Sequence, residues 1–137
     1  MAHNHAVPSD LTRNQGLVLG ALNSSGAPLS AYDILDALRA DGLRAPLQVY
    51  RALDKLVERG LAHRLESLNA FVACADEHCD RKQLTAFAIC TNCGKVDEFT
   101  DAVIEDRLGE WAGARSFKIE RTTMEIRGKC GQCAALA

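Results

Sequence analysis

The chain of 137 residues lacks any long hydrophobic run. Its N-terminus has no apolar stretch of secretory length, and no run of about eighteen apolar residues, the length that crosses a membrane, occurs anywhere. We therefore expect a soluble protein of a reducing compartment, the cytoplasm, with no membrane partner. Six cysteines in such a compartment predict metal or redox chemistry and not structural disulfides.

An excess of basic charge is also absent. The formal net charge of −2 argues against non-specific binding to nucleic acid, because a basic face normally supplies counterion release. Residues 11–70 hold seven Lys and Arg against six Asp and Glu, so DNA binding must rest on a local basic face and on dimer geometry. No His-Glu-x-x-His or comparable motif for a catalytic zinc is present, so we expect no enzyme.

The most informative residues that are present form two Cys-x-x-Cys pairs, Cys90 with Cys93 and Cys130 with Cys133. Four thiolates at this spacing predict a closed, tetrahedral zinc site of the structural kind. Two disulfides or two redox dithiols are the alternatives, but a redox motif needs only one pair, beside a βαβ pattern that this chain lacks. A metal site also suits a unit of about 50 residues, because a unit of that size usually needs a metal, a disulfide or a partner subunit for stability.

The first half of the chain has the pattern of three short helices followed by a hairpin. Ser30 is placed as an N-cap, Pro46 suits a first helical turn, and Gly60 suits the position after a helix. The expected elements are helices over residues 11–24, 30–42 and 46–60 and strands over 61–66 and 70–74. This is the element order of a winged helix-turn-helix.

The rest of the chain has a different organisation. Residues 1–10 are expected to be a disordered leader, with a fortuitous metal contact by His3 and His5 as the alternative, and residues 75–85 a hinge loop. Strands are expected over 86–90, 95–99 and 117–126 and a helix over 101–112, which together make a small α/β unit. The apolar stripe of that helix is expected to be core; it consists of Val103, Ile104, Leu108 and Trp111.

Three motifs carry a resemblance to a known family: residues 48–53 (QVYRAL), 88–99 (AICTNCGKVDEF) and 128–133 (GKCGQC). With them the chain resembles the ferric uptake regulator (Fur) family of bacterial metal-sensing repressors, and within it the zinc uptake regulators (Zur). The resemblance implies an α+β fold, with an N-terminal winged helix-turn-helix DNA-binding domain over 11–74 and a small C-terminal α/β dimerisation domain over 86–137. It also implies a homodimer with a four-cysteine structural zinc, switched by a second metal.

The resemblance makes the third helix the recognition helix and implies DNA contacts by Tyr50 and Arg51. An Arg near the start of a helix can reach a phosphate or a guanine, and a Tyr ring can contact a thymine methyl group. From the residues alone, a packed Tyr beside a solvated Arg fits equally well. Further candidates for phosphate contacts are Arg13, Arg44, Lys55 and Arg64. The expected partner is double-stranded operator DNA, bound with strong salt dependence.

A regulatory zinc site is implied in the same way. The resemblance places ligands at His63, Cys74 and Glu98, with His78 as the fourth and Cys79 as its main rival. Without the resemblance, a surface histidine and a solvated acid remain equally good interpretations of His63 and Glu98. A thiolate together with imidazoles and one carboxylate favours zinc over iron or manganese, so Cys74 decides the metal. Each subunit is then expected to hold one structural and one regulatory Zn²⁺.

The sequence thus predicts a repressor that binds operator DNA as a dimer when regulatory zinc is bound and that controls zinc-uptake genes. No substrate other than zinc is expected. The alternatives are a sensor of another metal within the same family, or a thiol or peroxide sensor that uses Cys79 or Cys74. The latter would need an exposed thiol of low pKa near a cation such as Arg81 or Lys82.

Overall fold

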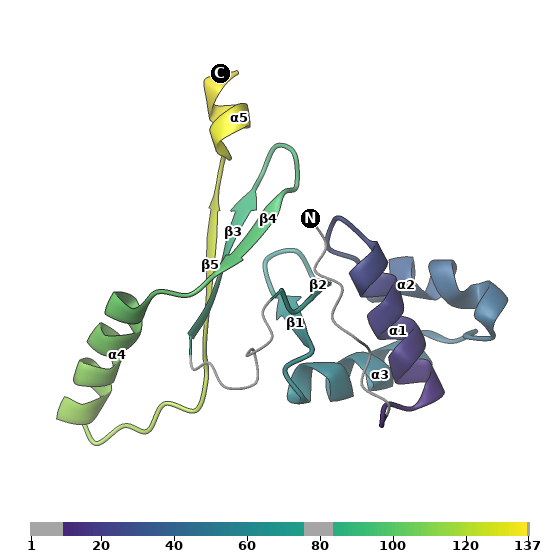
Figure 1. Ribbon diagram of the computed structural model, residues 1–137, viewed down its shortest axis with the longest axis horizontal. Helices are drawn as coiled ribbons and strands as arrows, with labels where there is room; N and C mark the ends of the chain where they lie inside the picture. The colour runs from purple at the N-terminus through teal and green to yellow at the C-terminus, as the bar shows by residue number, and fades with distance from the viewer. Residues whose placement is uncertain (1–9, 76–83, 137) are drawn as a thin grey trace. The chain divides into compact units, whose positions relative to one another are not determined.

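The computed structural model describes residues 10–75 and 84–136, which form two compact units (Figure 1). Nearly all of the expected leader, with His3 and His5, and most of the expected hinge loop, with His78 and Cys79, lie outside the described residues. None of the described helices is long and apolar enough to cross a membrane.

The first unit is helical with a terminal hairpin. Its elements are α1 (Arg13–Ser24), α2 (Ala31–Leu38), the 3-10 turn η1 (Arg39–Asp41), α3 (Pro46–Glu58), β1 (Ala62–Leu65) and β2 (Ala70–Ala73). The expected cap at Ser30 is confirmed: its hydroxyl accepts from the Asp33 amide at 3.1 Å while the Asp33 carboxylate accepts from the Ser30 amide. Gly60 follows α3 with φ 73°, as expected for a residue that ends a helix in the left-handed region.

The three helices enclose one hydrophobic core. Fully buried side chains come from each of them, among them Val18 from α1, Ile34 from α2 and Val49, Leu53 and Leu56 from α3. Burying each such side chain contributes about 1.5–3 kcal/mol relative to exposure, so this core positions α3 with only one of its faces in solvent.

The hairpin of β1 and β2 is attached to the helices. Its strands pair antiparallel with His63 opposite Val72, and Asn69 has φ 48° in the connecting turn. Leu29 and Phe71 exchange backbone hydrogen bonds of 3.0 and 2.7 Å, which join the hairpin to the segment between α1 and α2. The hairpin is therefore the wing of a winged helix-turn-helix.

The second unit is a three-stranded sheet with two helices. Its elements are β3 (Leu84–Cys90), β4 (Val96–Phe99), α4 (Ala102–Ala114), β5 (Thr122–Gly128) and α5 (Gly131–Ala135). The strand order is β4-β3-β5, with β3 antiparallel to β4 and parallel to β5. Both flanks of β3 are paired, and the strand is almost wholly buried.

Two expectations for this unit were wrong in detail. The last strand begins at Thr122 and not at Phe117, because the Phe117 amide donates to the Ala112 carbonyl at 2.8 Å and Ser116 has φ 54°. Phe117 is thus held against the end of α4. The short helix α5 was not expected at all; its first residue is a glycine, and three of its five positions belong to the cysteine pattern or its spacer.

The apolar stripe of α4 is not core within a single chain. Val103 is 77% exposed and Trp111 49% exposed, and Ala112 is the one buried residue of this helix. Trp111 makes an edge-to-face contact with Phe117 at 5.8 Å between ring centroids, and the Arg115 guanidinium lies over its ring at 4.7 Å. The described part of the chain therefore leaves most of this stripe uncovered.

Candidate metal centres and recognition helix

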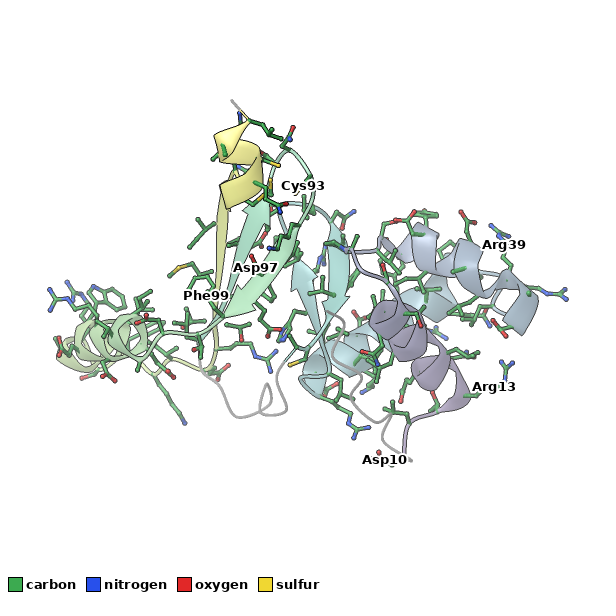
Figure 2. The ribbon with its side chains drawn as sticks, turned by 45° about the horizontal axis from the view of Figure 1, so that its top comes forward. Asp10, Arg13, Arg39, Cys93, Asp97 and Phe99 are labelled. Atoms are coloured by element: carbon green, nitrogen blue, oxygen red, sulfur yellow. The ribbon has the colours of Figure 1, made fainter. Side chains whose placement is uncertain are left out.

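The strand register brings the two cysteine pairs together. Cys90, the last residue of β3, pairs with Gly128, the last residue of the parallel strand β5. Because parallel strands end at the same edge of a sheet, the turn after Cys90 and the loop after Gly128 are neighbours. Cys130 is the N-cap of α5 and Cys133 lies within it. Figure 2 shows Cys93, in the turn between β3 and β4, next to α5.

The four sulfur atoms have the spacing of a metal site. They all lie within 4.8 Å of one another, and the Sγ atoms of Cys93 and Cys130 are 3.8 Å apart. A zinc ion with four Zn–S bonds of about 2.3 Å requires tetrahedral S···S edges of about 3.8 Å. The donor set and its spacing therefore fit Zn²⁺.

The shifted pKa values of these thiols also favour a bound cation. Backbone N–H groups of Cys130 and Cys93 lower the pKa of Cys90 to about 5. The Asn92 amide lowers the pKa of Cys133, but the neighbouring Cys130 thiol and burial outweigh it, and the pKa of Cys133 is raised to about 11. Several thiolates so close together repel one another, and a divalent cation supplies the compensating charge that lets all four ionise.

The two residues between Cys90 and Cys93 form hydrogen bonds to the segment that carries the other cysteine pair. The Asn92 side-chain amide donates to Cys133 Sγ at 3.2 Å. The amide and the hydroxyl of Thr91 both donate to the Gly128 carbonyl, at 2.8 and 3.2 Å. Sequence reasoning missed both residues, because the Cys-x-x-Cys spacing does not say which intervening side chain meets the other pair.

A second group of candidate ligands lies on the wing. His63 is opposite Val72, so Cys74, two residues further along, lies diagonally across the same face of the hairpin. The ligand atoms of His63 and Cys74 lie within 4.8 Å of each other, and Cys74 is 5% exposed. The Cys74 sulfur takes part in a disulfide in this structure, so it must be reduced before it can bind a metal.

Of the remaining candidate ligands, the structure describes only Glu98. Glu98 lies in β4 of the second unit opposite Phe87 and is half-buried, whereas its neighbour Asp97 is exposed. His78 and its rival Cys79 lie outside the described residues.

The exposed face of α3 carries the candidate DNA contacts. Val49, Ala52, Leu53 and Leu56 face the core. Tyr50 is 36% exposed and Arg51 lies beside it in solvent. In the part of the chain that the structure describes, the guanidinium groups of Arg44 and Arg51 form no ion pair. These two cations are available to an anionic partner.

The other basic candidates already have partners. Arg13 Nη2 donates to the Asp41 carbonyl at 2.7 Å and ties α1 to η1. Lys55 pairs with Glu58 at 3.3 Å and Arg64 with Glu66 at 3.6 Å, both at exposed positions. Exposed pairs contribute at most about 1 kcal/mol, so Lys55 and Arg64 can exchange these partners for phosphates, whereas Arg13 has a structural contact to lose.

Comparison with known proteins places the chain in a family. The model of the ferric uptake regulator family matches residues 10–127. The chain belongs to this family. It is 37% identical to the zinc uptake regulation protein of Escherichia coli K12 over 125 aligned residues. The aligned region covers 90% of this chain and 72% of that protein. The chain is 35% identical over 109 residues to the ferric uptake regulation protein of Bordetella parapertussis, which covers 77% of this chain and 74% of the relative.

Two solved structures of zinc uptake regulators resemble the chain closely. The crystal structure of holo XcZur superposes with a TM-score of 0.79 at 39% identity, over 91% of this chain and 86% of that one. A zinc uptake regulator complexed with zinc and DNA superposes with a TM-score of 0.81 at 35% identity, over 91% and 83%. The expected resemblance to Fur and Zur proteins is thereby confirmed, and so is the α+β fold class of winged helix and dimerisation domain.

Proposed function

We propose that this Fur-family chain is a zinc-responsive transcriptional repressor that binds double-stranded operator DNA as a homodimer and controls zinc-uptake genes. The observation that carries the proposal is the TM-score of 0.81 to a zinc uptake regulator complexed with zinc and DNA. The identity of 37% to a zinc uptake regulation protein supports the same assignment. The protein acts in the cytoplasm, where thiols stay reduced.

The first zinc of each subunit is structural and is held by Cys90, Cys93, Cys130 and Cys133. The sulfur spacing and the thiol chemistry described above support it. Four protein ligands leave no open position for a substrate, so this zinc stabilises the fold and has no catalytic role. It connects the segments that follow β3 and β5 at the end of the sheet where both strands finish.

The second zinc is regulatory and takes His63 and Cys74 from the wing and Glu98 from β4, with His78 or Cys79 as the fourth ligand. The thiol and the imidazole on one face of the hairpin support it, and the soft thiolate selects zinc over iron or manganese. His63 and Cys74 restrain the wing when this site is filled. The gain in DNA affinity equals the difference in zinc affinity between the conformations that can and cannot bind the operator.

The DNA-binding surface is the exposed side of α3, with Tyr50 and Arg51 at its centre and Arg44 just before the helix. Arg13, Lys55 and Arg64 are the further phosphate contacts. Two such helices in a homodimer would lie in successive major grooves of a two-fold symmetric operator. The uncovered stripe of α4 and the half-exposed Ile126 of the edge strand β5 support a dimer formed by the second unit.

Metal-dependent binding to DNA tests this function. A duplex selected from a random pool by the zinc-loaded protein, here called the selected duplex, is titrated with reduced protein at increasing free Zn²⁺, Fe²⁺ or Mn²⁺. We expect tight binding with zinc at concentrations at which iron and manganese have no effect. Activation by iron or manganese at lower free metal would favour the sensor of another metal. Loss of binding with peroxide and no response to zinc would favour the thiol sensor.

The ligand set is tested with single substitutions and a matched control. Glu98→Ala should lose zinc-activated binding, whereas Asp97→Ala, the next residue of β4, should keep it. His78→Ala and Cys79→Ala separate the two candidates for the fourth ligand, because only the true ligand should abolish activation. Wild-type zinc response in Glu98→Ala would remove Glu98 from the site.

A further inference from the structure

The solvent face of α3 carries an apolar side chain that no contact described above explains. Leu47, the second residue of the helix, is 57% exposed. It lies three and four positions before Tyr50 and Arg51, so the three side chains are neighbours on one helical face. Gln48, between them in sequence, is engaged otherwise: its Oε1 accepts from the Arg44 and Ala45 amides at 2.9 and 3.2 Å.

Charge is distributed unevenly along this face. Arg44 and Arg51 flank Leu47, and the first turn of α3 contains no acidic residue. The acidic residues Asp54 and Glu58 lie toward the other end of the helix. Because the N-terminal end of a helix is also the positive end of its dipole, the end that carries Leu47 is the one suited to approach a polyanion.

A single exposed leucine is ordinary on a protein surface, and exposure alone would indicate nothing. Here the leucine lies between two cations at the end of a recognition helix that enters the major groove. The apolar group that double-stranded DNA presents in that groove is the C5-methyl group of thymine. The cations can contact the phosphates of the DNA, while the apolar side chain between them can contact the thymine methyl group.

We propose that Leu47 contacts a thymine methyl group in the major groove and is a sequence-specificity residue of this protein. The proposal rests on the proposed function, since it requires α3 to enter DNA. It adds to the polar contacts of Arg51 an apolar contact that discriminates thymine from cytosine, which has no C5-methyl group. Zinc binding and dimerisation are not affected by this contact.

Replacing single thymines by deoxyuridine tests the proposal, because the replacement removes only the methyl group. Each thymine of the selected duplex is replaced in turn, symmetrically in both half-sites, and affinity is measured for zinc-loaded wild type and Leu47→Ala. At one position wild type should lose roughly fourfold per half-site, the change that corresponds to about one buried methyl group. Leu47→Ala should bind the thymine duplex more weakly by a similar factor and be insensitive at that position.

Three comparisons complete the experiment. Leu47→Met, which keeps an apolar side chain of similar volume, should remain sensitive at the same position. Leu136→Ala, the same change at a leucine that is 84% exposed in the second unit, should keep the whole wild-type profile. Affinity of Leu47→Ala for random DNA and its zinc content should equal those of wild type.

Equal sensitivity of wild type and Leu47→Ala at every thymine would overturn the inference while leaving the proposed function intact. Wild-type affinity of Leu47→Ala for the thymine duplex would do the same. If the zinc-loaded protein selects no duplex from the pool, both the proposed function and the role of Leu47 are wrong.

Discussion

The hydrogen bond from Asn92 to Cys133 Sγ links the two cysteine pairs at the level of a single residue. It stabilises the thiolate of the cysteine whose pKa is otherwise raised by its neighbours. Hydrogen bonds of this kind orient a ligand and tune its basicity, and their loss typically costs about 10- to 100-fold in metal affinity. Asn92 should therefore matter for zinc affinity although it is not a ligand.

Asn92→Asp replaces the donor by a carboxylate beside four thiolates. We expect zinc affinity to fall about 10- to 100-fold, measured by competition with a chelator. Gln132→Glu introduces the same charge between the cysteines of the second pair, at an exposed position, and should have a much smaller effect. Equal losses in the two variants would mean that charge alone, and not the hydrogen bond, is responsible.

Arg51 is the second single residue whose role can be measured. Arg51→Ala should cost about 1–3 kcal/mol in binding the selected duplex if the guanidinium contacts a base, or lower the salt slope by about 1 if it contacts a phosphate. Arg39→Ala removes the same charge from a residue paired with Asp36 at 3.1 Å in η1, and should change neither quantity. Affinity and salt slope both unchanged in Arg51→Ala would place it outside the interface.

Among the elements, α4 shows most clearly that one chain is incomplete. Its apolar stripe is expected core by sequence pattern, yet Val103 and Trp111 remain largely in solvent. A hydrophobic period of 3.6 residues predicts that a stripe will be covered, but it does not say whether the cover comes from the same chain or from another copy. A homodimer resolves this difference.

Placing a charge on that stripe should disrupt the dimer. Val103→Lys puts an ammonium group at an exposed position that is buried only on association, so we expect a monomer with its structural zinc retained, measured by sedimentation and zinc content. Asp106→Lys adds the same charge on the side of α4 that faces away from Leu108 and Trp111, and it should remain dimeric. A dimer of unchanged stability in Val103→Lys would show that α4 lies outside the interface.

The ends of elements could be predicted where neighbouring residues determine them, and not where they depend on pairing with residues far along the chain. The cap at Ser30 and the glycine that ends α3 are determined by neighbouring residues, and both are where the sequence indicated. The start of β5 depends on Leu84 pairing with Thr122 and on Phe117 staying with α4, neither of which leaves a local signal. Similarly, the Cys-x-x-Cys spacing predicts four ligands, whereas the meeting of the pairs depends on the parallel register of Cys90 and Gly128.

In the whole molecule, we expect folding and sensing to use different zinc ions. Cys90→Ser removes a sulfur from the closed site, so the variant should lose tightly bound zinc and form dimers poorly or unfold, because ligand binding and folding are coupled in small metal domains. Thermal unfolding and zinc content check this. A stable dimer with unchanged zinc content would contradict the structural role of the four-cysteine site.

The most direct test of zinc sensing compares wild type with Cys74→Ala on the selected duplex, under reducing conditions and with free zinc buffered. We expect Cys74→Ala to keep about one tightly bound zinc per subunit and to remain a dimer. Its zinc midpoint for DNA binding should rise at least about tenfold, since a ligand shifts an equilibrium only by its differential affinity for the two states. A Cys74→Ala variant that binds the duplex at the wild-type zinc midpoint would contradict the account.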